Sequence, residues 1–346
     1  MTFQRLLLVA CASTLVSFGA ISIMRVLLRR FPSLLADMPN KRSLHTVAIR
    51  RIGGIAVVGS ATLISTSLAI LLAVVEQWQA WLLGTTLVLF AVSWLDDLAG
   101  LPAHIRLAVH FGATTALVLS THAVSNWSPG TTVAYQVVHV VLFAWWTNLY
   151  NFMDGADGLA GGMSVFGFAA FAIAAFNTAQ APSMVAVIST TIAGASLGFL
   201  ALNFAPAKIF LGDAGSIPLG FLAAGISWIG TAHGTWAWWF GPAVFSAFIT
   251  DATVTIVRRI MTGKRFWEAH REHYYQRLIL SGWTHRKTCL VYYFLMLMSA
   301  FCALSAKNSP HPWTWLLPLV ITYASLIAVL EWRFHQEKKD GKNTET

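Results

Sequence analysis

Charged residues are scarce in this sequence. They make up 11% of its 346 positions, whereas hydrophobic residues make up 56%. A soluble chain of this length would form about two domains. The composition excludes a soluble fold, because apolar runs long enough to cross a hydrocarbon core as helices recur along the whole sequence. The chain is therefore expected to be an all-α, polytopic integral membrane protein.

Cysteine is also rare. The three cysteines, Cys11, Cys289 and Cys302, lie within apolar segments, and no two of them have the CxxC spacing. This pattern argues against a zinc site and against a redox pair. The sequence also lacks internal repeats and low-complexity segments.

Hydropathy predicts the spans. Windows of about 19 residues predict about eleven transmembrane helices, at residues 5–27, 54–75, 79–95, 104–122, 131–149, 161–179, 183–203, 216–231, 236–258, 288–306 and 313–333. The first run, from Leu6 to Met24, could be a signal peptide, but its length suffices for a first span. We expect residues 1–334 to form one transmembrane domain and residues 335–346 a disordered polar tail.

Basic residues indicate the orientation of the spans. They crowd one set of loops and the C-terminal tail: Arg29, Arg30, Lys41, Arg42, Arg50, Arg51, Lys208, Arg258, Arg259, Lys264, Arg265, Arg271, Arg277, Arg286, Lys287, Lys338, Lys339 and Lys342. The other set of loops carries only Arg5 and Lys307. By the positive-inside rule the crowded loops are cytoplasmic, which puts the N-terminus outside and the C-terminus in the cytoplasm.

Acidic residues gather on the same side. Eight of them fall on predicted cytoplasmic loops or the adjoining helix ends: Asp37, Asp96, Asp97, Asp154, Asp157, Asp213, Glu268 and Glu272. Asp251 lies inside a span, where an acid is either functional or part of a structural hydrogen bond. Because topology rules barely constrain acids, their position predicts a shared cytoplasmic site.

The stretch from Asn148 to Gly162, NLYNFMDGADGLAGG, is polar and lies between two apolar runs. Such polarity at the edge of a bilayer is costly unless it faces water, a partner or a ligand. Asn151, Asp154 and Asp157 recur every three residues and would share one face of a helical turn. Oxygen ligands of this kind suit magnesium. The glycines fit close approach of a ligand or close packing of helices.

Two further groups of polar residues stand at the ends of spans. Asp96 and Asp97 could bind a divalent metal, supply a general base, or form a solvated helix end. Asp213, in the segment AKIFLGDAGS, could ligate a metal beside a phosphate held by free N–H groups, or simply cap the following helix. Lys208 could reach the same phosphate.

The longest cytoplasmic loop carries FWEAHREHYYQRL, from Phe266 to Leu278. His270, Arg271, His273 and Arg277 put cations and hydrogen-bond donors on one amphipathic surface. Such a surface could grip a pyrophosphate or a sugar. A helix that lies on the membrane surface is the alternative.

Five motifs, in this order, resemble those of the polyprenyl-phosphate N-acetylhexosamine-1-phosphate transferases, glycosyltransferase family 4. They are KRSLH with the following Arg-x-Gly-Gly, DDLAGL, NFMDGADGLAGG, PAKIFLGDAGS and HREHYYQRL. The last motif is closest to the O-antigen-initiating branch, whose members use sugars such as N-acetylfucosamine, N-acetylquinovosamine or N-acetylglucosamine. The first loop departs from the family, since Ala48, Ile49, Arg50 and Ile52 stand where prolines and an extra glycine are usual.

The resemblance implies a reaction at the cytoplasmic face of a bacterial inner membrane. An N-acetylated amino-sugar 1-phosphate would pass from a UDP-sugar to undecaprenyl phosphate, and UMP would leave. Mg²⁺, or Mn²⁺ in its place, would be the cofactor. The family implies membrane lipids as surroundings and no nucleic acid as partner, and it leaves a homodimer open.

The resemblance also implies roles for single residues. Asp213 and Asn151 would bind the metal, and Asp157 would lie near the uracil. Catalytic roles would fall to Asp96, Asp97 and Asp154, either by deprotonation of the lipid phosphate in a direct displacement, which we favour, or through a covalent intermediate. The full set of substrate contacts would be Lys41, His45, Arg51, Asp157, Asn203, Lys208, His270, Arg271 and His273.

Two other classes of protein are alternatives. An ion-coupled transporter predicts acids near the membrane midplane and symmetric halves. Here the acids lie almost entirely at cytoplasmic ends, and the sequence shows no repeat. An inactive scaffold in an envelope-polymer complex is also compatible with the sequence.

Overall fold

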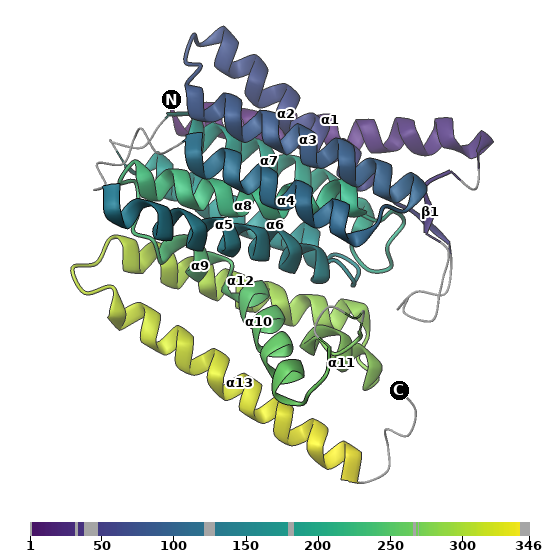
Figure 1. The fold of residues 1–346 in the computed structure, drawn as a ribbon. Helices are drawn as coiled ribbons and strands as arrows, with labels where there is room; N and C mark the ends of the chain where they lie inside the picture. The colour runs from purple at the N-terminus through teal and green to yellow at the C-terminus, as the bar shows by residue number, and fades with distance from the viewer. Residues whose placement is uncertain are drawn as a thin grey trace.

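The computed structural model describes residues 2–31, 34–37, 48–120, 129–178, 183–265, 268 and 270–339. Two predicted substrate residues, Lys41 and His45, lie outside these ranges. The described chain is a bundle in which most helix axes lie roughly along one common line (Figure 1).

The first half of the chain contributes five long helices: α1 (Phe3–Leu27), α2 (Gly53–Leu71), α3 (Gln77–Ala99), α4 (Ala103–Ser120) and α5 (Pro129–Phe152). A short 3-10 helix, η1 (Leu28–Arg30), follows α1. Two short strands, β1 (Ala36–Asp37) and β2 (Ile49–Arg50), pair antiparallel between η1 and α2, with Ala36 opposite Arg50.

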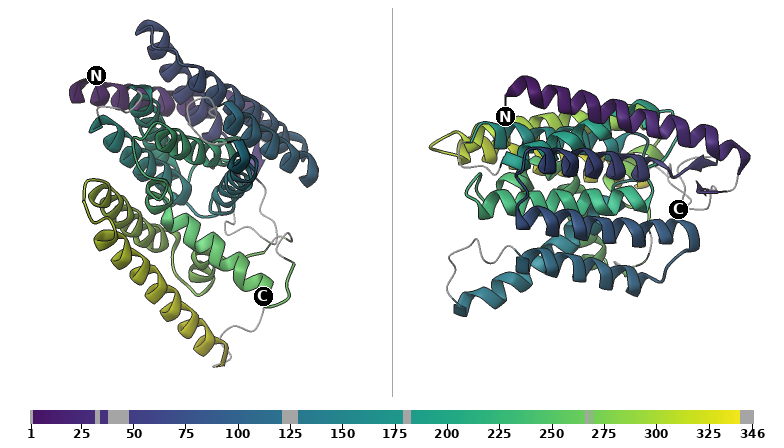
Figure 2. Two further views of the ribbon diagram at one scale, coloured as in Figure 1. Left: turned by 60° about the vertical axis from the view of Figure 1, so that its left-hand side comes forward. Right: turned by 90° about the horizontal axis from the view of Figure 1, so that it is seen from above.

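The second half contributes the remaining helices: α6 (Leu159–Phe176), α7 (Ser183–Asn203), α8 (Asp213–Ala232), α9 (Phe240–Val244), α10 (Ser246–Met261), α11 (Tyr274–Leu280), α12 (His285–Lys307) and α13 (Trp313–Lys339). In Figure 2 the hairpin of α12 and α13 stands beside the rest of the bundle.

Eight of the described helices are long and apolar enough to cross a membrane: α1, α2, α3, α6, α7, α8, α12 and α13. This finding confirms the expected all-α, polytopic membrane protein. A described helix also overlaps each of the predicted spans. Because α4, α5 and α10 are not among the eight, the number eleven stays a prediction.

The predicted span 236–258 is not one continuous helix. It is divided into α9 and α10 at Phe245, whose ψ of 14° departs from the helical value. The ring of Phe245 packs among aromatic rings, with its centroid 5.4 Å from Phe171 and 5.5 Å from Trp146. Hydropathy measures apolar length and does not register such a local change of direction. As a result α10 is inclined to the bundle (Figure 1).

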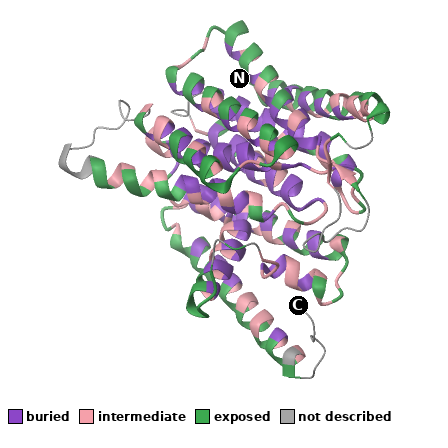
Figure 3. Cartoon of the chain, turned by 45° about the vertical axis from the view of Figure 1, so that its right-hand side comes forward, coloured by how far each residue is buried: buried purple, intermediate pink, exposed green. Residues whose placement is uncertain are grey.

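The most enclosed helix is α8. In the 18-residue stretch of α8 that could cross a membrane, 94% is buried, whereas the corresponding stretch of α13 is 17% buried. It packs against α2, α3 and α5, and Figure 3 shows the buried residues concentrated in the middle of the bundle. Because α8 begins at Asp213, this acid stands at the end of the central helix.

The two ends of the described chain lie at opposite ends of the bundle. Figure 1 shows α1 beginning at one end and α13 finishing at the other. Which end faces the cytoplasm stays a prediction. The predicted polar tail, residues 335–346, overlaps the end of α13, which continues to Lys339, and residues 340–346 lie outside the described ranges. A pair at i,i+4 supports this last part of the helix, since Arg333 Nε donates to Glu337 Oε1 at 2.8 Å.

Candidate active site

The first loop packs directly on the segment that contains Asp213. Arg51 forms an isolated parallel bridge with Phe210, and the N–H of Gly54 donates to the carbonyl of Leu211 at 2.8 Å. A Cβ atom on Gly54 would lie 2.2 Å from the backbone nitrogen of Gly215. No side chain fits there, so a glycine permits the contact. Two motifs far apart in the sequence thus form one unit.

Asp97 caps the central helix from outside it. Its carboxylate accepts hydrogen bonds from the N–H groups of Asp213, at 3.3 Å, and Ala214, at 2.9 Å. The side chain is only 1% exposed. A carboxylate at this position accepts hydrogen bonds from N–H groups that have no partner within the helix. Its negative charge also interacts favourably with the positive end of the helix dipole. Asp97 therefore fixes the start of α8.

Arg51 joins this cap to the strand pair. Its Nη1 lies 3.1 Å from Asp97 Oδ1 and its Nη2 lies 2.7 Å from Asp37 Oδ1. Burial lowers the pKa of Arg51, but the carboxylates of Asp37, Asp97 and Asp213 outweigh this effect and raise it above its usual value. The guanidinium is a third exposed, so it remains within reach of an anion.

Arg106 lies between two of the predicted site acids. Its Nη1 lies 2.8 Å from Asp96 Oδ2 and 3.5 Å from Asp213 Oδ2. This arginine falls inside the predicted span 104–122 and belongs to none of the predicted site residues. A charge near the start of a span was the available signal, since charged residues within membrane helices are costly and usually functional.

The polar stretch after α5 reaches the same place. Ser216, on the first turn of α8, donates its hydroxyl to Asn151 Oδ1 at 2.8 Å. For the carboxylate of Asp154, no hydrogen bond or ion pair is found in the described part of the chain. Burial, followed by the negative charge of Asp213, raises the pKa of Asp154 well above its usual value. The environment of Asp154 therefore disfavours its ionised form, although the positive charge of Arg51 acts in the opposite direction.

The predicted metal ligands fit a magnesium site of one particular kind. Among the described residues, no group of three or more His, Cys, Asp or Glu side chains is placed to hold a metal ion. Mg²⁺ in phosphoryl-transfer sites usually takes one or two carboxylates and completes its shell with water and substrate phosphates. Asp213, half-buried and close enough to Asp154 to raise its pKa, forms such a donor set with the oxygen of Asn151, which is bonded to α8.

Asp157 and Asn203 hold the loop that precedes Asp213. Asp157 Oδ2 accepts a hydrogen bond from the N–H of Ala207 at 3.0 Å. Asn203 Oδ1 accepts from Gly158 N at 2.9 Å, and its Nδ2 donates to the carbonyl of Ile209 at 2.9 Å. Both side chains therefore support the backbone around the site.

Two further side chains, those of His285 and Lys208, lie near this loop. The N–H of Asp157 donates to Nδ1 of His285, the first residue of α12, at 3.2 Å. His285 is not among the predicted site residues, because nothing in the sequence around it distinguishes it. Lys208 is exposed, so its ammonium group is free to reach an anion at the rim of the site.

The histidine motif is held by the acid inside the tenth helix. Asp251 is 4% exposed and accepts hydrogen bonds from the N–H groups of Tyr274, at 2.9 Å, and Tyr275, at 3.1 Å. Its Oδ1 also lies 3.4 Å from His273 Nδ1, and His273 is only 3% exposed. Of the two interpretations of Asp251, the structural hydrogen bond is therefore the observed one.

Tyr275 connects the histidine motif to the polar stretch. Its hydroxyl donates to the carbonyl of Phe152 at 2.9 Å. A Cβ atom on Gly155 would lie 2.1 Å from that hydroxyl. The loop that carries Asp154 and the loop that carries the histidines are thus in direct contact.

His270 and Arg271 are the more accessible members of the motif. Burial, and then the charges of His273 and Arg259, lower the pKa of His270 to about 4, so the ring is neutral at physiological pH. Its Nδ1 accepts a hydrogen bond from the N–H of Glu272 at 3.3 Å. The Arg271 guanidinium is partly exposed and makes no ion pair within the described ranges.

The gathered acids do not all belong to one site. Glu272 pairs with Arg259 and with Lys264, whose Nζ lies 3.0 Å from Glu272 Oε1. Glu268 pairs with Arg265 at 3.1 Å. Together with Asp251, these acids organise the loop between α10 and α11. The expectation of a single shared site therefore holds only for the aspartates near Asp213.

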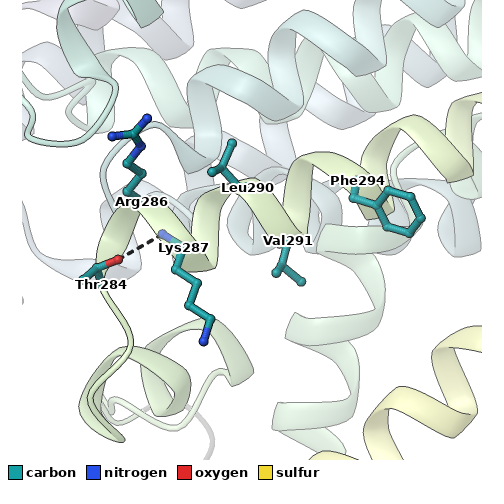
Figure 4. Close-up of a pocket in the computed structure, with 6 residues that line it drawn as sticks. All are labelled: Thr284, Arg286, Lys287, Leu290, Val291 and Phe294. Carbon is teal, nitrogen blue, oxygen red and sulfur yellow. Dashed lines mark hydrogen bonds between the residues drawn. The ribbon is translucent and has the colours of Figure 1, made fainter.

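A separate cavity of about 450 Å³ lies on the surface of α12 (Figure 4). It is lined by Thr284, Arg286, Lys287, Leu290, Val291 and Phe294. None of these is a predicted site residue. In Figure 4 Arg286 and Lys287 extend in different directions, and the hydroxyl of Thr284 accepts a hydrogen bond from the N–H of Lys287 at 3.1 Å.

Comparison with known proteins identifies the family. Residues 79–231 match glycosyl transferase family 4. A decaprenyl-phosphate N-acetylglucosaminephosphotransferase of Mycolicibacterium smegmatis is 31% identical over 87% of this chain and 82% of its own length. The chain belongs to the polyprenyl-phosphate N-acetylhexosamine-1-phosphate transferase family.

Two other relatives of this transferase family member show the breadth of the match. A probable undecaprenyl-phosphate N-acetylglucosaminyl 1-phosphate transferase of Bacillus subtilis is 27% identical over 79% of this chain and 77% of its own length. A phospho-N-acetylmuramoyl-pentapeptide-transferase of Mycolicibacterium vanbaalenii is 30% identical over 67% of this chain and 74% of its own length. The family prediction made from the five motifs is thereby confirmed.

Proposed function

We propose that this protein transfers an N-acetylated amino-sugar 1-phosphate from a UDP-sugar to undecaprenyl phosphate. An oxygen of the lipid phosphate attacks the β-phosphorus of the UDP-sugar. The bond between this phosphorus and the bridging oxygen breaks, and UMP leaves with that oxygen. The products are undecaprenyl-diphospho-sugar and UMP. We favour direct displacement over a covalent enzyme intermediate.

One observation carries this proposal. Acids and arginines from segments far apart in the sequence meet around the start of α8, where Arg106 lies between Asp96 and Asp213. Transfer of a phosphoryl group between two anions chiefly needs neutralisation of charge and alignment of the reactants. Partly exposed arginines beside largely buried carboxylates, at the end of a membrane bundle, would supply both, and a lipid phosphate lies at that level.

Mg²⁺, with Mn²⁺ as a substitute, is the proposed cofactor. Asp213 and Asn151 would hold it, and Asp154 is a further carboxyl group whose pKa responds to the charge of Asp213. The metal would neutralise charge on the pyrophosphate of the donor. The protein's own share is to place these oxygens, through the cap that Asp97 forms on α8 and the bond from Ser216 to Asn151.

The remaining residues divide into two groups in this proposal. Arg51, Arg106, Lys208, His270 and Arg271 face the phosphates and the sugar, and Lys41 and His45 would join them from the first loop. Asp157, Asn203 and His273 act mainly by holding backbone and loops, as their buried hydrogen bonds and contacts indicate. Asp157 would still border the uracil through the loop that it orders. Asp96, Asp97 and Asp154 would assist the lipid phosphate.

The relatives favour N-acetylglucosamine as the first donor sugar to test. Two of the three named above are called N-acetylglucosamine phosphotransferases, one acting on undecaprenyl phosphate and one on decaprenyl phosphate. The third is named for a muramoyl-pentapeptide precursor. An O-antigen product remains our prediction from the histidine motif, and a cell-wall precursor is the competing product.

The alternative of an ion-coupled transporter finds no support in these relatives. The site acids also lie at one end of the bundle rather than at its middle, where transporters of that kind bind their ions. We place the site at the cytoplasmic face of the bacterial inner membrane. A reporter fused after Gly263 should therefore read as cytoplasmic, and an external signal would invert the topology.

The decisive experiment follows UMP release. Purified protein is incubated with undecaprenyl phosphate, MgCl₂ and a panel of UDP-linked N-acetylated amino sugars. We expect UMP with at least one sugar, and its loss on addition of EDTA. The absence of UMP with every sugar would refute the proposed function.

A matched variant tests the metal site. Asp213→Asn should abolish turnover while the folded protein is recovered in normal amount. It should also lose the rise in melting temperature that MgCl₂ with UDP-sugar gives the wild type. Normal activity of this variant would remove Asp213 from the site.

A further inference from the structure

The C-terminal half of α13 carries a glutamate that receives three donors from other elements. Arg258 Nη1 and Arg277 Nη1 each lie 2.6 Å from Glu331 Oε1, and the hydroxyl of Tyr274 donates to the same oxygen at 2.8 Å. We call these four residues the Glu331 cluster. It joins α10, α11 and α13 at one carboxylate oxygen.

The cluster is packed as well as paired. The guanidinium of Arg277 lies 3.9 Å above the ring of Phe334, one turn further along α13. Arg258 and Arg277 each lie 5.5 Å from the ring centroid of Tyr274. Stacked guanidinium groups lose little freedom when they form ion pairs, because their planes are already fixed. The geometry is therefore more specific than that of an ordinary surface ion pair.

The cluster reaches the histidine motif through two short connections. Arg258 Nη2 donates to the carbonyl of Glu272 at 2.7 Å, and Glu272 directly precedes His273. Tyr274 follows His273 and begins α11. The backbone on both sides of His273 is thus bound to groups that Glu331 holds. From the other side, Asp251 binds the N–H groups of Tyr274 and Tyr275.

Packing alone does not place this end of α13. Its main neighbour is α12, and only 17% of its most apolar window is buried. The carboxylate of Glu331 is itself 39% exposed, so a single exposed pair would contribute little to stability. A carboxylate shared by three donors from two other elements is suited to fixing geometry instead.

We propose that Glu331 is a positioning residue for sugar-phosphate transfer, which holds α11 and the loop with His270 and Arg271 at the correct distance from the aspartates. This inference rests on the proposed function. Glu331 lies outside all five sequence motifs and beyond residues 79–231, the range that matches the family. It acts through Arg258, Tyr274 and Arg277 and does not contact the substrate.

The test separates positioning from folding by steady-state kinetics. Glu331→Gln keeps the size of the side chain and removes its charge. We expect KM for the UDP-sugar to rise about tenfold while kcat falls by less than about threefold, because binding by the loop is weakened and the chemical groups are unchanged. A variant that merely folded less well would lower the amount of active enzyme and leave KM as it was.

Two further variants complete the test. Glu337→Gln, also on α13, removes a carboxylate whose one ion pair among the described residues is with Arg333, and it should leave KM unchanged. Tyr274→Phe removes one of the three donors and should raise KM about twofold to threefold, which provides a measurement if Glu331→Gln does not fold. An unchanged KM in Tyr274→Phe and in folded Glu331→Gln would overturn the inference, as would an equal rise in Glu337→Gln.

The two proposals fail differently. If the wild type releases no UMP with any sugar, the proposed function fails. If the wild type is active and KM does not respond to the Glu331 cluster, only the positioning role of Glu331 fails.

Discussion

Arg106 Nη1 lies 3.5 Å from Asp213 Oδ2, although 107 positions separate the two residues. The same nitrogen lies 2.8 Å from Asp96 Oδ2. A cation from α4 thus links the end of α3 to the start of α8. Under the proposed function, this arginine would exchange a carboxylate partner for an incoming phosphate.

Loss of the Arg106 charge should reduce transfer strongly. We expect Arg106→Gln to lower kcat/KM by about one hundredfold, because a charge-assisted contact to a phosphate in the transition state is lost. UMP release measures this effect. Arg29→Gln removes an exposed arginine from η1 and should stay near wild type. Equal activity of the two variants would show that Arg106 takes no part in the reaction.

Asp97 should matter for stability as well as for turnover. Asp97→Ala removes the acceptor for two N–H groups of α8 and the partner of Arg51. Loss of such a cap and of a buried acceptor costs about 1–3 kcal/mol. We expect a lower melting temperature in detergent, with Asp97→Asn intermediate because its amide oxygen still accepts. A melting temperature equal to that of the wild type would contradict the cap.

The contact between α2 and α8 admits no side chain. Gly54→Ala should lower both the melting temperature and the rate of UMP release, because its Cβ would lie 2.2 Å from Gly215 N. Gly59→Ala is the matched control on the same helix, since nothing lies within 4 Å of a Cβ there, and it should be neutral or stabilising. The idea of a required close contact fails if Gly54→Ala behaves like Gly59→Ala.

The lowered pKa of His270 predicts how the stability of the protein depends on pH. Its pKa in the folded protein is about 4, below the ordinary value of 6.5. Between these values the unfolded chain binds more protons at this group, so stability falls as the pH drops from 6.5 towards 4. We expect the melting temperature of the wild type to fall more steeply in this window than that of His270→Gln. Parallel curves would show that His270 is not held neutral by the fold.

Much of this architecture follows from the sequence. In a bilayer, the backbone N–H and C=O groups of a long apolar run find their hydrogen-bond partners within a helix. Most helices therefore lie where hydropathy predicts them. The motifs also name three residues that the structure brings to the start of α8: Asp213 begins this helix, Asp97 accepts the N–H of Asp213, and Asn151 accepts the hydroxyl of Ser216. Asp97 and Asn151 lie in the last turns of α3 and α5, and Asp213 begins α8, so the ends of three apolar helices meet here.

Other features depend on three-dimensional contacts that no local pattern contains. The break at Phe245 arises from rings on other helices. Arg106 looked like part of a span, and His285 had no distinguishing neighbours in the sequence. Asp251 and His273 looked like two separate functional candidates, whereas burial brings them together as a support for α11.

The contact of Gly54 with Gly215 has a thermodynamic consequence for ligand binding. Arg51 precedes this contact on one chain segment, and Asp213 precedes it on the other. With no space between the two backbones, neither segment can shift without moving the other. Under the proposed function, a ligand that displaced Arg51 would also displace the Asp213 loop, and any resulting coupling of the two binding free energies would be equal in both directions. Binding of the UDP-sugar and binding of the lipid phosphate would in this way be thermodynamically coupled before any bond is made.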